Sequence, residues 1–169
     1  MHTSSLLKRT AFIAFSTAVI MVLLLKGFTA TQAQTVHPAS GANQAFNQAS
    51  KDFGVPTSIL KALCYMEGRL SNHGGSPSID QGYGCMHLVQ NSRVHTLDQA
   101  AKDLGVSTNL LKTDLTTNIR GGASVLRDYA LQLSNNHTLP ASLADWYGAI
   151  AAYSNASTQN VAHMYADGL

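Results

Sequence analysis

The sequence predicts an all-α domain that is interrupted by one loop region. After residue 44, apolar residues recur at three- and four-residue spacing along most of the chain, which is the period of an amphipathic helix. The exception is 71–88, where Gly, Ser and Asn are frequent, so this stretch is expected to form loop with a short hairpin. The length after residue 33 suits one domain with a buried core rather than two domains.

The first 33 residues have the composition of a secretory signal peptide. Lys8 and Arg9 precede an apolar run over 11–25, and small or polar residues follow it. We expect cleavage after Ala33, which would release a secreted protein that is free of the membrane. An uncleaved anchor is the alternative, because the apolar run approaches the length that spans a bilayer.

The charge of the chain changes when this segment is set aside. Of the 11 Lys and Arg residues, three lie in 1–33, which leaves eight cations against nine acids. The basic balance of the whole chain therefore indicates no nucleic-acid partner. The polar stretch 34–43 predicts a linker, and the domain is expected over 44–169.

The first two predicted helices meet at a glycine. A helix over 44–53 is expected to end at Gly54, and Thr57 is expected to cap the helix that follows. Residues 48–55 recur with small changes as 99–106, so a second pair of helices of the same form is predicted. Two copies are too few for a repeat protein and indicate reuse of one helical hairpin.

Three more helices are predicted in the C-terminal half. Asn118 is expected to open the first of them, in which the adjacent glycines at 121–122 cost about 1 kcal/mol each relative to alanine. That cost indicates close packing of another backbone. Ser142 and Asp145 form a capping box for the next helix, and Thr158 is expected to cap the last one.

Glu67 is the candidate catalytic residue. It is the only glutamate in the chain, and it lies near the end of a predicted helix with Leu60 and Cys64 on nearly the same side. A carboxyl beside an apolar face loses hydration, which favours its protonated form, as general acid catalysis requires. A solvated acid at a helix end is the alternative interpretation.

The chain has two cysteines, Cys64 and Cys85. In an exported protein such a pair favours a disulfide, which would join the Glu67 helix to the glycine-rich stretch. Closing this loop would contribute about 3 kcal/mol in the chain-entropy model. Two buried free thiols are the alternative.

Four motifs occur in an order that resembles the soluble lytic transglycosylase domain. They are Tyr65-Met66-Glu67-Gly68, Gly84-Cys85-Met86-His87-Leu88, Asn118-Ile119-Arg120-Gly121-Gly122-Ala123 and Ala152-Tyr153-Ser154. The match looks closer still to the lysozyme-like domain that precedes the amidase domain in some secreted bacterial N-acetylmuramoyl-L-alanine amidases. The resemblance covers about 44–166 and implies a mostly helical, goose-lysozyme-like fold.

The resemblance also implies roles for individual residues. Glu67 would be the catalytic acid, and the hydroxyl of Tyr153 would lie near it across a saccharide cleft. The substrate-binding residues that it implies are Tyr83, Gly84, Met86, His87, Tyr153 and Ser154. Three departures stand out: Gly68 replaces a serine, Ser154 replaces an asparagine, and the two cysteines are unusual.

The predicted function is that of a lytic transglycosylase acting on peptidoglycan glycan strands outside the cell, at the cell wall. The resemblance implies a single carboxylate, with the 6-hydroxyl of the muramic acid as the attacking group. A muramidase is the alternative, with Asp80 as its second carboxylate, although Asp80 also suits a turn. A peptidoglycan-binding module without activity is a third possibility. We expect a monomer without a cofactor, and no metal site is expected from the spacing of His73, His87, His95 and His137.

Overall fold

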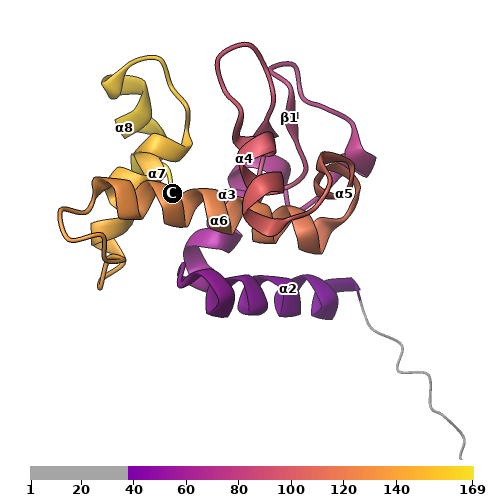
Figure 1. Cartoon of the computed structure of the whole chain (residues 1–169), viewed down its shortest axis with the longest axis horizontal. Helices are drawn as coiled ribbons and strands as arrows, with labels where there is room; N and C mark the ends of the chain where they lie inside the picture. The colour runs from indigo at the N-terminus through magenta and orange to yellow at the C-terminus, as the bar shows by residue number, and fades with distance from the viewer. Residues whose placement is uncertain (1–37) are drawn as a thin grey trace, which may run out of the picture. The chain divides into compact units, whose positions relative to one another are not determined.

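The computed structural model describes residues 38–169 of the chain (Figure 1). The predicted signal peptide and its cleavage point lie outside the described residues. Within the described part, helices dominate and the only sheet has two short strands, so the predicted all-α class is confirmed. No helix in this part is both long and apolar enough to cross a bilayer.

The described residues form seven α-helices. Their bounds are α2 (Pro38–Phe53), α3 (Thr57–Gly68), α4 (Thr96–Leu104), α5 (Thr108–Thr113), α6 (Leu115–Leu133), α7 (Tyr147–Tyr153) and α8 (Gln159–Asp167). The longest connection between them, from α3 to α4, contains the two strands. Two 3-10 turns, η1 (His73–Gly75) and η2 (Ala144–Trp146), lie in the connections.

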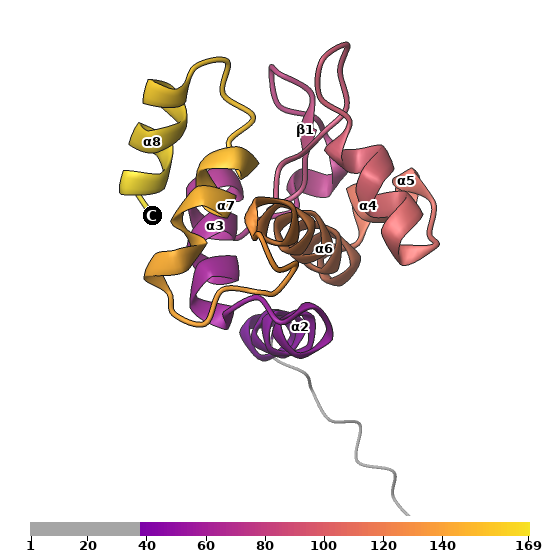
Figure 2. The ribbon, with the colours of Figure 1, turned by 60° about the vertical axis from the view of Figure 1, so that its left-hand side comes forward.

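Helix α6 is the centre of the domain. Figure 2 views it close to its axis, with α2, α3, α7, α4 and α5 arranged around it, and each of these helices packs against it. Its inward residues Ile119, Ala123 and Leu126 are fully buried. A helix that is covered on several sides must bury most of its surface, which explains why small residues are frequent along it.

The predicted hairpin lies between α3 and α4. Strands β1 (Gly82–Tyr83) and β2 (Leu88–Val89) pair antiparallel, with Tyr83 opposite Leu88. The four-residue turn between them is closed by His87, whose N–H donates to the Gly84 carbonyl at 3.1 Å. Both Gly84 and His87 have a positive φ, which lets the turn reverse the chain tightly.

The internal similarity corresponds to two helical hairpins, α2–α3 and α4–α5. Gly54 and Gly105 both end their helices in the left-handed region, as predicted. Ser107 caps α5 by accepting a hydrogen bond from the Leu110 N–H at 3.2 Å. The cap predicted at Thr57 is wrong, because Pro56 occupies the N-cap position of α3 and no side chain caps the helix.

Two helix starts also differ from the prediction. Helix α2 begins at Pro38, inside the expected linker, since proline lacks the N–H that the first turn would leave unpaired anyway. Helix α6 begins before Asn118 and is capped by Asp114, whose Oδ1 accepts from the Thr117 N–H at 2.7 Å. Asn118 is instead a buried residue inside the helix.

Of the two caps predicted in the C-terminal part, the one at Thr158 is confirmed and the capping box at Ser142 is wrong, because α7 begins at Tyr147 and no side chain caps η2 or α7. The Ser142 hydroxyl donates to Asp145 Oδ2 at 2.7 Å at the start of η2, and α7 continues from there. Thr158 Oγ1 accepts from the Val161 N–H at 3.4 Å and caps α8. Of these two residues, only Thr158 therefore satisfies a helix N–H group with its side chain.

The glycine pair in α6 allows side chains, not another backbone, to approach. A Cβ on Gly122 would lie 2.5 Å from the Met86 Cβ, and a Cβ on Gly121 would lie 2.7 Å from Leu111 Cδ2. The predicted backbone contact is therefore wrong. The missing side chains make room for Met86, which brings the turn of the hairpin down onto the central helix.

Candidate active site

Glu67 lies in the last turn of α3, at the point where the helix leaves the core. The preceding residues Leu60, Leu63 and Cys64 are buried, and the Glu67 side chain keeps 17 % of its surface exposed. The helix ends directly afterwards, because Arg69 adopts the left-handed conformation. Glu67 is therefore partly shielded and still reaches solvent, as a group that meets a substrate must.

Both carboxyl oxygens of Glu67 have a partner from a distant part of the chain. The Tyr165 hydroxyl, from α8, donates to Oε1. The His87 ring, from the hairpin turn, places Nδ1 3.1 Å from Oε2. Two contacts of this kind fix both the position and the rotation of the carboxyl group.

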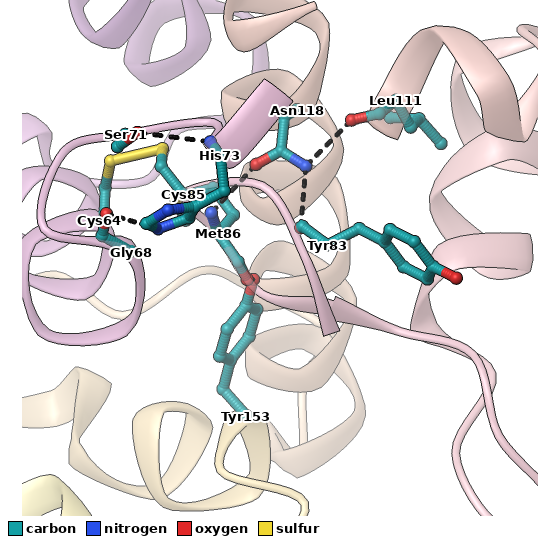
Figure 3. The surroundings of a disulfide bond; sticks show 10 residues. All are labelled: Cys64, Gly68, Ser71, His73, Tyr83, Cys85, Met86, Leu111, Asn118 and Tyr153. Atoms are coloured by element: carbon teal, nitrogen blue, oxygen red, sulfur yellow. Dashed lines mark hydrogen bonds between the residues drawn. A yellow bond between two sulfur atoms is a disulfide. The ribbon is translucent and has the colours of Figure 1, made fainter. Parts of the chain in front are cut away.

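The disulfide joins this helix to the hairpin turn. Cys64 and Cys85 are bonded, with Cα atoms 4.6 Å apart (Figure 3). Cys64 lies about one helical turn before Glu67, and Cys85 lies two residues before His87. The bond therefore links the backbone segments that carry the carboxyl and the imidazole.

Asn118 holds the same turn from the side of the central helix. Figure 3 shows its side chain between the turn and α5. Its Oδ1 accepts from the Met86 N–H at 2.8 Å, and its Nδ2 donates to the carbonyls of Tyr83 at 3.0 Å and Leu111 at 2.9 Å. Asn118 is fully buried, so these backbone groups find in it the partners that water cannot supply.

Met86 and Tyr153 support the turn from below. The Met86 side chain is fully buried, and its carbonyl accepts from the Tyr153 hydroxyl at 2.7 Å. The resemblance implied that this hydroxyl lies near the glutamate. Its hydrogen bond goes to the Met86 carbonyl, and the hydroxyl that donates to Glu67 belongs to Tyr165. Burial, then the charge of Glu67, raises the pKa of Tyr153 well above its ordinary value.

The other predicted substrate-binding residues lie around the turn and beside α7. Tyr83 is half-buried, with Lys112 Nζ 4.3 Å from its ring centre. Gly84 is buried where a side chain would collide with Asn118. The Ser154 hydroxyl donates to the Ala151 carbonyl at 2.6 Å, so it is bonded within its own turn.

His87 contacts two carboxyls at once. Its Nε2 lies 3.2 Å from Asp80 Oδ2, on the side of the ring opposite Glu67. The hydrogen bond with Glu67 raises the pKa of His87 above its ordinary value, and although burial opposes this, the charges of Glu67 and Asp80 add to it. The structure therefore brings together Glu67, His87 and Asp80 from three separate segments.

Tyr165 is the site residue that the sequence reasoning missed. It lies in α8, and its ring is half-buried. Burial, then the charge and hydrogen bond of Glu67, raises the pKa of Tyr165 far above its ordinary value, so the hydroxyl stays protonated and donates. No motif marked it, because its role depends on where α8 folds back.

The described residues contain no group of three His, Cys, Asp or Glu side chains placed to hold a metal ion. The chemistry that Glu67 and His87 offer directly is proton transfer, and Tyr165 contributes a hydrogen bond to Glu67. A carboxyl that has a hydrogen-bond partner on each oxygen and is open to solvent on one side can exchange a proton with a bound group.

The sequence of the domain also matches a known protein family. Residues 44–165 match the transglycosylase SLT domain. This match covers most of the chain, which therefore belongs to the transglycosylase SLT domain family, whose members carry lytic-transglycosylase-type activity on peptidoglycan. No curated protein matches the chain.

Proposed function

We propose that this protein is an exported lytic transglycosylase that cleaves the β-1,4 bond between N-acetylmuramic acid and N-acetylglucosamine, with Glu67 as its general acid. The observation that carries the proposal is the environment of Glu67. Its carboxyl is partly shielded and is contacted on one oxygen by Tyr165 and on the other by His87. Family membership supplies the substrate class.

The reaction needs a proton for the leaving oxygen while positive charge develops on the sugar ring. Protonated Glu67 gives its proton to that oxygen, and the glycosidic bond breaks. The 6-hydroxyl of the muramic acid then attacks the anomeric carbon of its own ring, from which the leaving oxygen has departed. The Glu67 carboxylate accepts the hydroxyl proton. The product is a 1,6-anhydro sugar, and Glu67 returns to its protonated form.

A muramidase is the second candidate, because one observation favours a role for another carboxylate. Asp80 contacts the same imidazole ring as Glu67, and 64 % of its side-chain surface is exposed. A hydrolase needs a second carboxylate as base or nucleophile. The imidazole of His87 lies between the two carboxyl groups, so the contact that Asp80 makes in the structure is with His87.

The test is the product of purified peptidoglycan, read by mass spectrometry, with the full chain and its Glu67→Gln and Asp80→Asn variants. We expect anhydro-muropeptides from the wild type and none from Glu67→Gln. Reducing-end products that disappear in Asp80→Asn would establish the muramidase instead. Binding to peptidoglycan without release by any variant would refute an enzyme and leave the binding module.

Export is a separate part of the proposal and has its own test. The composition of 1–33 supports a cleaved signal that sends the protein to the cell wall. Mass spectrometry of the protein recovered outside the cell should find Gln34 as the first residue. A protein that stays with the membrane and retains residue 1 would indicate an anchor. The amidase-linked resemblance of the sequence adds no further activity to this proposal.

A further inference from the structure

The imidazole of His87 lies between two carboxyl groups, one on each ring nitrogen. Nδ1 is 3.1 Å from Glu67 Oε2, and Nε2 is 3.2 Å from Asp80 Oδ2. Glu67 comes from α3, Asp80 from the loop before β1, and His87 from the hairpin turn. Three segments therefore converge on a single ring, and each nitrogen has a defined acidic partner.

The Asp80 side of this arrangement is fixed by the backbone of its loop. The Ser78 hydroxyl donates to Asp80 Oδ1 at 2.7 Å and accepts from the Gly82 N–H at 2.8 Å. The His87 ring also lies directly against Gly82, because a Cβ at this position would overlap the atoms of the ring. Asp80 thus meets Nε2 in a fixed direction, and the ring has little room to turn.

These contacts determine where protons lie. Asp80 is a carboxylate: burial alone would raise its pKa, but the hydrogen bond from Ser78 and the charge of His87 outweigh burial and lower it. A carboxylate only accepts, so Nε2 carries a hydrogen. The hydrogen bond between Nδ1 and Glu67 Oε2 then contains one proton. The pair is either imidazolium with carboxylate or neutral imidazole with carboxylic acid.

We propose that His87 Nδ1 and Glu67 Oε2 share one proton, and that Asp80 fixes the orientation of the His87 ring that makes this sharing possible. This inference rests on the proposed role of Glu67 as the acid. His87 acts through Glu67 and is a positioning residue, as is Asp80. The proton moves along one hydrogen bond, and neither form requires a heavy atom to shift.

The two tyrosines next to the hydrogen bond between His87 and Glu67 keep their protons. Tyr165, from α8, donates to the second oxygen of Glu67, and Tyr153, from α7, donates to the Met86 carbonyl. Burial raises the pKa of both hydroxyls. With both tyrosines protonated and Asp80 ionised, the shared proton is the one that leaves as the pH rises through the raised pKa of His87.

The functional consequence is a wider pH range for the acid. An isolated carboxyl loses its proton at mildly acidic pH, whereas a proton that is shared with imidazole is retained until the pair as a whole titrates. A glutamine at position 87 could still donate to Glu67, but it cannot hold a proton. The alkaline limb of activity should therefore depend on His87 far more than activity at acidic pH does.

The experiment measures kcat/KM on purified glycan strands from pH 4.5 to 9 for the full chain and for His87→Gln, Asp80→Asn and the control His137→Gln, which changes an exposed loop histidine. We expect the loss in His87→Gln to be about tenfold larger at pH 8 than at pH 5, with a smaller loss of the same form in Asp80→Asn. His137→Gln should follow the wild type. Parallel profiles for wild type and His87→Gln would overturn the proposal.

A second readout does not depend on activity. The ring nitrogens of His87, followed by 15N NMR in the full chain, should titrate above pH 6.5, the ordinary value of the histidine pKa. In Glu67→Gln, which keeps the shape of the side chain, the titration should fall to a lower pH. An unchanged titration would refute the shared proton.

The two proposals fail in different ways. If the wild type yields no anhydro-muropeptides, the proposed function fails, and the NMR titration still decides whether the proton is shared. If the wild type is active and its alkaline limb is the same with glutamine at position 87, the shared proton fails and the proposed function stands.

Discussion

Gly68 and Cys85 lie in direct contact: a Cβ on Gly68 would be 2.5 Å from the Cys85 Cα, which leaves no room for a side chain. The position that corresponds to Gly68 holds a serine in the family pattern that the chain resembles. Here the disulfide draws the hairpin turn onto the end of α3 and occupies that space. The glycine and the disulfide therefore depend on each other.

We expect Gly68→Ser to lower the free energy of unfolding by about 1–3 kcal/mol, the usual cost of overpacking. The cost should shrink when the same change is made with Cys64→Ser and Cys85→Ser, because the turn can then move away from the helix. Denaturant unfolding of the four proteins gives the coupling energy. If Gly68→Ser lowered the free energy of unfolding equally with and without the disulfide, the disulfide would not be what presses Cys85 against Gly68.

Loss of the disulfide alone should lower the free energy of unfolding by about 3 kcal/mol, since Cys64 and Cys85 are separated by 21 residues. The comparison is denaturant unfolding of the wild type with and without reductant. The variant with both cysteines changed to serine serves as the control and should not respond to reductant. A wild type whose unfolding midpoint ignores reductant would contradict this expectation.

Asn118→Ala should destabilise the protein by about 3 kcal/mol, because it leaves two buried backbone groups and the partly buried Tyr83 carbonyl without this partner. Asn118→Asp keeps the acceptor for the Met86 N–H but loses both donated bonds, so it should be destabilising as well. Asn109→Ala, at an exposed position in α5, is the matched control. Unfolding midpoints near that of the control would mean that the turn is held by other contacts.

Tyr165→Phe should lower kcat by roughly 10- to 100-fold while the fold persists, because Glu67 loses the donor that orients Oε1. Tyr147→Phe removes an exposed hydroxyl that contacts Asp167 and should leave kcat unchanged. Release of muropeptides from peptidoglycan measures both. If the two variants lost activity equally, the effect could not be assigned to the Glu67 contact.

The stability of the fold should depend on pH through His87 and Asp80. The raised pKa of His87 means that its contacts stabilise fully below pH 6.5 and are lost as the pH rises through the raised value. The lowered pKa of Asp80 means that its contacts stabilise above pH 3.8 and are lost as the pH falls through the lowered value. Both contributions are therefore present between these two limits.

His87→Gln should accordingly reduce the free energy of unfolding more at pH 5 than at pH 9. Denaturant unfolding of the wild type and the variant at both pH values tests this expectation. A difference that is the same at pH 5 and pH 9 would show that the charge on His87 does not contribute to stability.

The sequence predicted the helical class and the helical hairpins because both depend on local patterns. Apolar spacing and the stops at Gly54 and Gly105 act within a few residues, and the structure follows them. The caps show the limit of such patterns. Thr57 and Asn118 are residues that suit a helix start. The N-cap position of α3 is nevertheless occupied by Pro56, and α6 begins at Leu115, before Asn118.

The candidate site could be predicted only where it follows the chain locally. Glu67 was marked by its helix and by being the sole glutamate, and His87 by its place in the hairpin motif. Tyr165 could not be recognised, because its contact with Glu67 spans 98 residues. The sequence favoured Asp80 as a turn residue over a second carboxylate, and its contact with the His87 ring appears only in the structure.

The span between Glu67 and Tyr165 also orders the events of folding. A contact between residues so far apart forms only after the intervening chain has been made and compacted, since closing a long loop costs more entropy than closing a short one. A ribosome-bound chain that has not yet produced α8 lacks the hydroxyl that orients Glu67. Enzymatic activity would thus appear abruptly, with docking of the last helix, and would report completion of the fold rather than its beginning.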